Sequence, residues 1–192
     1  EAQDAAVAAA ARLVAFAREQ GATRVTLLGT SALRDCGNRA EFATSLQQVV
    51  GLPLTLISGE VEARLVAAGV RTDPAYAAYP NLTVFDLGGG SLEVATLRGE
   101  RVSLARSFPL GSVRLTQGYL RGGEGVVDEL DQASIREHLV RTLGTLLSPK
   151  IAEQGLVVGA GGVFSAVALY LEAIGEPVVD GRLPVLRIRA LK

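Results

Sequence analysis

The segment 86–93 carries the residue types that a phosphate and metal site needs. A carboxylate, three glycines, a hydroxyl and a second carboxylate follow one another in it: Asp86, Gly88, Gly89, Gly90, Ser91 and Glu93. Glycines let peptide N–H groups turn toward an anion without a Cβ in the way, which forms a nest for phosphate oxygens. Because carboxylates alone would repel phosphate, we expect Asp86 and Glu93 to bind Mg²⁺ directly or through its waters. The alternative interpretation is a flexible hairpin connection, which the pair of acids disfavours.

A second glycine segment, over 159–162, could hold another phosphate. Its glycines, ahead of an apolar helix expected over 163–173, are Gly159, Gly161 and Gly162. A turn there would present N–H groups at a helix N-terminus, where anions bind. Both glycine segments follow buried strands, expected over 82–85 and 156–158, and α/β folds bind ligands at the carboxyl ends of strands. Taken alone, the second segment is also explained as a packing turn.

Hydrophobic periodicity and cap residues predict the elements that carry these loops. Further strands are expected over 24–28, 54–57 and 94–97, the last in an antiparallel hairpin that turns at 98–100 and ends at Phe108. Helices are expected over 4–20, from an N-cap at Asn38 to 50, over 60–69, from a cap at Ser112 to 120, and over 183–192. Loops are expected over 73–81, 122–128 and 159–162. A longer helix is expected directly after the loop over 122–128. In that helix Ser134 and Glu137 have capping-box spacing, and one apolar stripe is formed by Ile135, Leu139, Leu143, Leu146 and Leu147. This alternation predicts an α/β fold whose sheet is covered on both faces.

Composition narrows the class of protein. The chain has 192 residues, of which 48% are hydrophobic, and a formal net charge of −1. It can therefore bury a substantial core, and it has no general basic field with which to hold a nucleic-acid polymer. No apolar run reaches the ~20 residues of a membrane span. A single cysteine, Cys36, excludes an internal disulfide, and His138 has no second ligand at metal spacing. We expect a cytoplasmic protein with a local anion site.

Four motifs occur in an order that is specific to one family. They read TSALRD over 30–35 (with Asn38 shortly after), ISGEVEARL over 57–65, DLGGGSLE over 86–93 and LGSVRLT over 110–116. The series resembles the exopolyphosphatase and guanosine pentaphosphate phosphohydrolase family, the Ppx/GppA phosphatases. The second glycine segment and the helix after it extend the resemblance over nearly the whole chain.

This resemblance implies a fold, an activity and a cofactor. The fold would be the actin-like ATPase (ribonuclease H-like) fold, two-lobed and α/β, with mixed sheets flanked by helices. Residues 1–62 would be the remainder of the N-terminal lobe and 63–192 the second lobe. The activity would be Mg²⁺-dependent release of terminal phosphate from inorganic polyphosphate, from guanosine pentaphosphate or from both. The sequence does not choose between these substrates, and one possible assembly is a homodimer. No nucleic-acid polymer or membrane is expected as a partner.

The resemblance also implies roles for individual residues. Glu62 matches the family carboxylate that positions and activates the attacking water, and Arg34 matches an arginine that faces the phosphate chain. Asp86 and Glu93 match the acids associated with the cation, and 88–91 matches the phosphate loop. These roles are physically coherent, because a carboxylate can orient water and a guanidinium can grip two phosphate oxygens. A surface ion pair of Arg34 with Asp35, and a solvated position for Glu62, are the plainer alternatives.

The sequence departs from the family pattern at its start. Family members open with a strand and an Asp-x-Gly-Ser-Asn-Ser phosphate loop, which this sequence lacks, so we expect a fragment of a hydrolase that is poorly active or inactive alone. Val61 and Leu92 replace acid or polar residues of the family, and both changes look tolerable. Two other functions stay open: a non-catalytic module that binds polyphosphate or alarmones, and an ATP-dependent kinase or ATPase of the actin-like superfamily. The acids beside the phosphate loop disfavour the first, and the motif over 57–65 disfavours the second.

Overall fold

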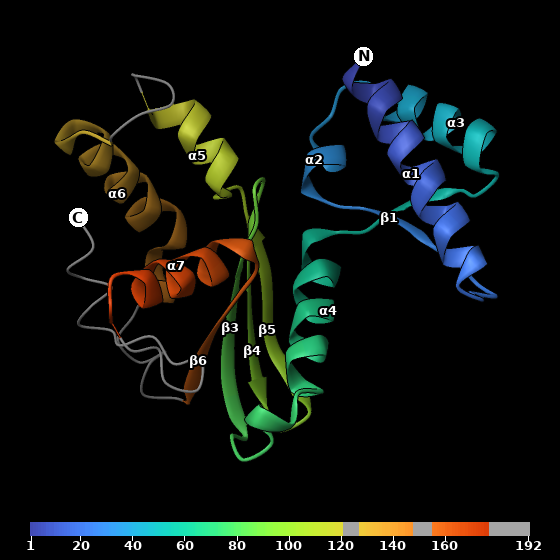
Figure 1. The fold of residues 1–192 in the computed structure, drawn as a ribbon. Coiled ribbons are helices and arrows are strands. Elements are labelled where there is room, and N and C mark those ends of the chain that lie inside the picture. Colours follow the sequence, from blue (N-terminus) through green and yellow to red (C-terminus); the bar gives the residue numbers. More distant parts are fainter. Residues whose placement is uncertain (121–126, 148–154, 177–192) are drawn as a thin grey trace. The chain divides into compact units, whose positions relative to one another are not determined.

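The chain separates into two units, Glu1–Glu62 and Ala63–Lys192, each of which is described by itself (Figure 1). The computed structural model describes residues 1–120, 127–147 and 155–176. The helix expected over 183–192, and most of the loop expected over 122–128, lie outside the described residues. No helix in the described ranges combines the length and the apolar character that crossing a membrane requires.

The first unit packs two helices against a small parallel sheet. Its elements are α1 (Ala2–Glu19), β1 (Leu27–Gly29), α2 (Ser31–Arg34), α3 (Arg39–Val50) and β2 (Leu54–Leu56). Strands β1 and β2 are parallel, with Leu27 opposite Leu54, and both leucines pack on the core of α1 and α3. The predicted helices over 4–20 and 38–50 and the strand over 54–57 are therefore confirmed. The strand predicted over 24–28 forms only from Leu27 onward.

Helix α4 (Gly59–Arg71) continues the chain into the second unit. Ser58 caps it, because the Ser58 Oγ accepts a hydrogen bond from the N–H of Val61 at 3.2 Å. The helix was predicted over 60–69, and its buried alanines, Ala63 and Ala67, explain why it is stable: small side chains let it lie close to the sheet. The loop expected over 73–81 contains a short 3₁₀ turn, Pro74–Tyr76, and ends where β3 begins.

The second unit is built on a mixed sheet of four strands in the order β5-β4-β3-β6. Its strands are β3 (Asn81–Leu87), β4 (Leu92–Arg98), β5 (Arg101–Phe108) and β6 (Leu156–Ala160). The first three are antiparallel neighbours, as the predicted hairpin required, and β6 runs parallel to β3. The carboxyl ends of β3 and β6 therefore lie at the same end of the sheet, and the two glycine segments follow those strand ends.

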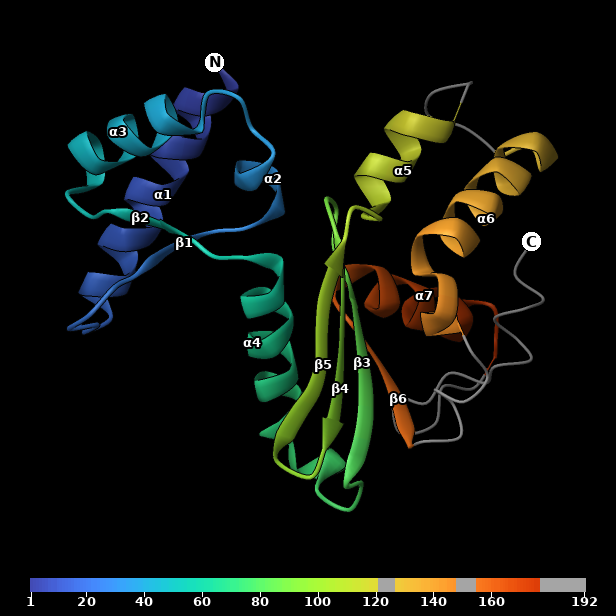
Figure 2. The ribbon, with the colours of Figure 1, turned by 180° about the vertical axis from the view of Figure 1, so that it is seen from behind.

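Helices cover both faces of this sheet, as the alternating pattern predicted (Figures 1 and 2). One face packs Leu82, Val84 and Leu97 against α4. The opposite face packs Val94 and Phe108 beneath α5 (Ser112–Tyr119) and α6 (Glu129–Leu143), with α7 (Gly162–Ala173) beside them. Because side chains alternate along a strand, the even-numbered residues of β3 and the odd-numbered residues of β4 share the α4 face. Each fully buried leucine or valine contributes about 1.5–3 kcal/mol.

Two predicted helix caps are wrong. Helix α6 begins at Glu129, directly after the loop expected over 122–128, but its cap is Asp128 and not the proposed capping box: the Asp128 carboxylate accepts a hydrogen bond from the N–H of Asp131 at 2.7 Å. Ser134 lies inside the helix, where its hydroxyl donates to the carbonyl of Leu130. Ser112 is the first residue of α5, and the N-cap position belongs to Gly111. Asp and Ser are both strong N-cap residues, so sequence alone could not choose between Asp128 and Ser134 as the cap of α6.

Candidate functional site

The glycine loop over 88–91 joins β3 to β4, and its carbonyl groups are bound by the start of α5. The carbonyl of Gly88 accepts from the N–H of Ser112 at 2.9 Å, and that of Gly89 from the N–H of Arg114 at 3.2 Å. The Arg114 Nε donates to the carbonyl of Gly90 at 3.0 Å. Within the part of the chain that the structure describes, the N–H groups of Gly89 and Gly90 donate no backbone hydrogen bond. The loop therefore keeps peptide N–H groups for an anion.

The start of α5 approaches the loop so closely that only glycine fits at position 111. A Cβ built there would overlap the carbonyl of Gly89. Gly111 is buried, and the backbone contacts with the loop begin at the next residue. The motif over 110–116 is therefore the support of the glycine loop, which is a role that sequence reasoning did not assign to it.

Asp86 and Glu93 lie directly opposite each other on β3 and β4, at the end of the sheet from which the glycine loop emerges. Both belong to the α4 face, Asp86 is half-buried and Glu93 is only 3% exposed. Like charges directly opposite in a strand pair destabilise the sheet, and a cation bound by both carboxylates would offset this repulsion. The structure thus brings together the two acids that the sequence proposed as cation ligands.

The chemistry of these two acids fits Mg²⁺. Among the described residues there is no group of three or more His, Cys, Asp or Glu side chains arranged to hold a metal ion. A two-carboxylate site does not suit zinc, which takes three or four protein ligands. Mg²⁺ keeps several waters and is commonly held by one or two carboxylates together with substrate phosphates. Asp86 and Glu93 are the residues that would hold it.

The second glycine segment lies beside Asp86, because Asp86 pairs with Ala160 across the parallel strands. Gly161 follows at the N-cap of α7 with a φ of 91°, and a Cβ there would lie 2.5 Å from the Asp86 Oδ1. Helix α7 starts at Gly162, so its first N–H groups lie next to this carboxylate's strand end. Gly159, by contrast, belongs to β6 and packs against the ring of Phe164, so the turn predicted over 159–162 is wrong at its start.

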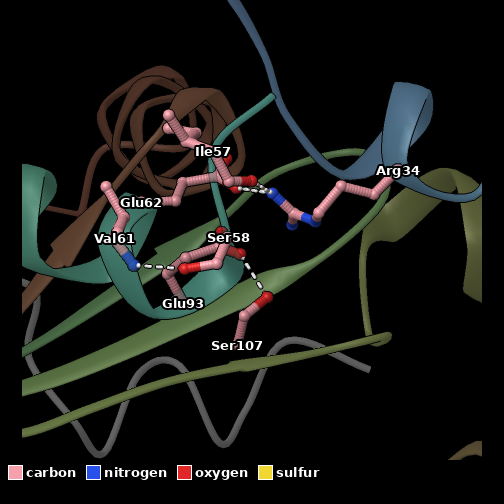
Figure 3. Close-up of polar contacts among 7 residues, drawn as sticks. All are labelled: Arg34, Ile57, Ser58, Val61, Glu62, Glu93 and Ser107. Carbon is pink, nitrogen blue, oxygen red and sulfur yellow. Dashed lines mark hydrogen bonds and ion pairs between the residues drawn. The ribbon is translucent and has the colours of Figure 1, made fainter. Parts of the chain in front are cut away.

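Arg34 and Glu62 form an ion pair within the first unit (Figure 3). The Arg34 Nη1 donates to the Glu62 Oε2 at 2.8 Å and to the carbonyl of Ile57 at 2.9 Å. Arg34 ends α2 and Glu62 lies in the first turn of α4, where the helix dipole favours a carboxylate. The short loop after β2 thus aligns both side chains at the carboxyl ends of the parallel strands.

Burial separates this pair from an ordinary surface contact. The side chains of Arg34 and Glu62 are 23% and 18% exposed, so Glu62 is not the solvated helix residue of the plainer interpretation. Nη1 makes both hydrogen bonds of Arg34, and Nε and Nη2 have no hydrogen-bond partner among the described residues. Arg34 can therefore hold Glu62 with one group and still offer N–H donors to phosphate.

The predicted residues fall into two local groups, one in each unit. Arg34 and Glu62 form the first, and the acids and N–H groups around the glycine loop form the second. Sequence reasoning missed two supporting residues. Arg114 binds the loop carbonyl, and Ser107 donates to the Glu93 Oε1 at 2.6 Å. Arg114 stood in a recognised motif, whereas Ser107 carried no signal that sequence reasoning used.

Solved structures share this fold. An exopolyphosphatase from Cytophaga hutchinsonii superimposes with a TM-score of 0.79 at 22% identity, over 93% of this chain and 57% of that chain. The Ppx/GppA family member of Aquifex aeolicus superimposes with a TM-score of 0.68 at 25% identity, over 88% of this chain and 52% of that one. The fold is therefore the α/β, actin-like ATPase fold expected from the motifs.

The family follows from the sequence match. The model of the Ppx/GppA phosphatase family matches residues 1–191, so the chain belongs to that family. The uncharacterized protein SCO0757 of Streptomyces coelicolor is 38% identical over 123 residues, which is 64% of this chain and 36% of that protein. The chain thus spans about a third of the length of this relative and little more than half of the two solved structures.

Proposed function

We propose that the protein releases terminal phosphate from a phosphoanhydride chain, in inorganic polyphosphate or in guanosine pentaphosphate. The observation that carries this proposal is which peptide groups of the glycine loop are already hydrogen-bonded. The carbonyl groups of Gly88, Gly89 and Gly90 are bound by α5, while N–H groups remain beside the opposed carboxylates of Asp86 and Glu93. Such a loop suits a phosphate accompanied by a divalent cation.

Glu62 supplies the general base in this proposal. As water attacks the terminal phosphorus, its oxygen bonds to phosphorus, the bridging P–O bond breaks, and the shortened chain leaves. The proton of the water passes to the Glu62 carboxylate. The Arg34 ion pair supports this role because it fixes the Glu62 Oε2 at 2.8 Å from a half-buried guanidinium. Phosphoryl transfer depends mainly on such positioning and on charge stabilisation.

Arg34 has a second role, which is to bind phosphate through the Nε and Nη2 groups of its guanidinium. Nε and Nη2 can donate two parallel hydrogen bonds to one phosphate group, which a lysine could not do. When bound, Mg²⁺ would neutralise charge on the phosphate chain, and Asp86 and Glu93 would hold it.

Phosphate release by the full-length protein tests the proposal. Inorganic polyphosphate, guanosine pentaphosphate and ATP are each supplied with Mg²⁺, and free phosphate is measured over time. We expect release from at least one of the first two substrates, with ATP much slower. Tight binding of polyphosphate without any release would favour the non-catalytic module instead. Efficient ATP turnover without release from polyphosphate would favour an ATPase.

A further inference from the structure

One row of polar side chains crosses the sheet of the second unit at the end from which the glycine loop emerges. Asp86 pairs with Glu93, and Glu93 pairs in turn with Ser107, so β3, β4 and β5 each contribute one residue. All three lie on the α4 face, because neighbours two positions away pack there: Val84, Ala95 and Ala105. The Ser107 hydroxyl donates to the Glu93 Oε1 at 2.6 Å (Figure 3).

This hydrogen bond acts on a buried carboxylate, and it is a direct contact from the neighbouring strand. Glu93 is 3% exposed and faces a second carboxylate across the strand pair. A buried carboxylate is tolerated only when donors or cations compensate its charge. A serine hydroxyl can donate one hydrogen bond, and Ser107 donates it to Glu93. The donor sits on a strand in register, so it restricts rotation of the carboxylate about its last side-chain bond.

We propose that Ser107 is a positioning residue for the cation site. It orients the Glu93 carboxylate toward the ion that Asp86 and Glu93 hold, and it does not touch substrate. The inference rests on the proposed function, because it takes that cation site as its premise. Groups that hydrogen-bond to metal-ligating carboxylates typically change metal affinity about 10- to 100-fold when they are removed.

The chain offers a matched control on the same strand. Ser103 is also in β5, and its hydroxyl also makes one hydrogen bond, to the carbonyl of Thr96 at 3.1 Å. It is exposed and contacts no carboxylate in that bond. Ser103→Ala therefore removes a hydroxyl from the same strand without disturbing Glu93. Ser107→Thr is the conservative rescue, because threonine keeps the hydroxyl and suits a strand.

Direct cation binding is the test, with Mn²⁺ as a spectroscopic probe. The full-length protein is titrated with Mn²⁺, free Mn²⁺ is followed by electron paramagnetic resonance, and Mg²⁺ is then added as a competitor. We expect Ser107→Ala to weaken cation binding about 10- to 100-fold and Ser107→Thr to restore it to within about threefold. Ser103→Ala should bind as the wild type does. Thermal unfolding without added metal shows that each variant is folded.

Kinetics add a second readout that a merely structural role would not move. Ser107→Ala should need more Mg²⁺ for half-maximal phosphate release but recover its kcat at saturating Mg²⁺. Equal cation affinity of Ser107→Ala and the wild type would overturn the inference while leaving the proposed function intact. Wild-type protein that binds no Mn²⁺ would also overturn it. If the wild type releases no phosphate and Ser107→Ala still loses cation affinity, the proposed function fails and the role of Ser107 stands.

Discussion

The ion pair between Arg34 and Glu62 leads to a prediction with a calculable size. If Arg34 positions Glu62 for catalysis, the two residues act as a unit, and their effects on kcat/KM are not additive. Arg34→Ala removes the bond at 2.8 Å to the Glu62 carboxylate. A hydrogen bond to a charged group contributes about 1.5–3 kcal/mol. Since roughly a fifth of each side chain remains exposed, solvent reduces this to about 1–2 kcal/mol.

A double-mutant cycle separates the coupling energy between Arg34 and Glu62 from any contribution of Arg34 to phosphate binding. We expect Arg34→Ala, Glu62→Gln and the double variant to show a coupling energy of about 1–2 kcal/mol in kcat/KM, which is roughly a 5- to 30-fold departure from additivity. Loss of the phosphate grip lowers kcat/KM in both backgrounds equally, so it cancels in the cycle. The assay is release of phosphate by the full-length protein from the better of the two proposed substrates.

Arg39 provides the control for the cycle. It is an exposed arginine on α3, and its Nη1 donates to the carbonyl of Arg34 at 3.1 Å, so it lies nearby without reaching Glu62 in that bond. Arg39→Ala should change kcat/KM by less than about threefold, as surface substitutions usually do. A coupling energy below about 0.5 kcal/mol between Arg34 and Glu62 would refute the positioning role, because it lies within the additivity of independent sites.

Two glycine substitutions test the other group of residues. Gly161→Ala should lower the free energy of unfolding by about 1–3 kcal/mol in a calorimetric scan, because its φ of 91° suits only glycine and the new Cβ would press on the Asp86 carboxylate. Gly162→Ala is the control: its new Cβ meets no atom within 4 Å, so its free energy of unfolding should be nearly unchanged. Gly111→Ala should displace the glycine loop and raise the KM for substrate, whereas Gly118→Ala on the open side of α5 should leave KM unchanged and add about 0.5–1 kcal/mol of helix stability. A normal KM in Gly111→Ala would contradict the supporting role of α5.

Element types and the position of the glycine loops could be predicted from the sequence because the signals are local. Alternating strands, the hairpin turn at 98–100 and the apolar face of α1 each depend on residues within a few positions of one another. The cap of α6 was not predictable, because Asp128 and Ser134 both satisfy the rules for an N-cap and tertiary context decides between them. The turn predicted at Gly159 is wrong for a similar reason: in sequence, a glycine that lies in a strand against the ring of Phe164 cannot be told from a glycine in a turn.

Contacts across strands and between distant segments could not be predicted. Ser107 reaches Glu93 only because the strands pair in one register, and an irregularity after Thr96 shifts that register along β4 and β5. A slip by one residue would have turned Ser107 to the opposite face. Arg34 and Glu62 are 28 residues apart, so their motifs suggested a shared site without showing that the two side chains bind each other.

The central claim is that Glu62 readies water to attack the terminal phosphoryl group, and oxygen labelling tests it most directly. The full-length protein is supplied with polyphosphate or guanosine pentaphosphate in water enriched in ¹⁸O, and both products are analysed by mass spectrometry. The account predicts one ¹⁸O atom in each released phosphate and none in the shortened chain, with release slowed about 100-fold or more in Glu62→Gln. Label in the shortened chain, or full-speed release by Glu62→Gln, would contradict it.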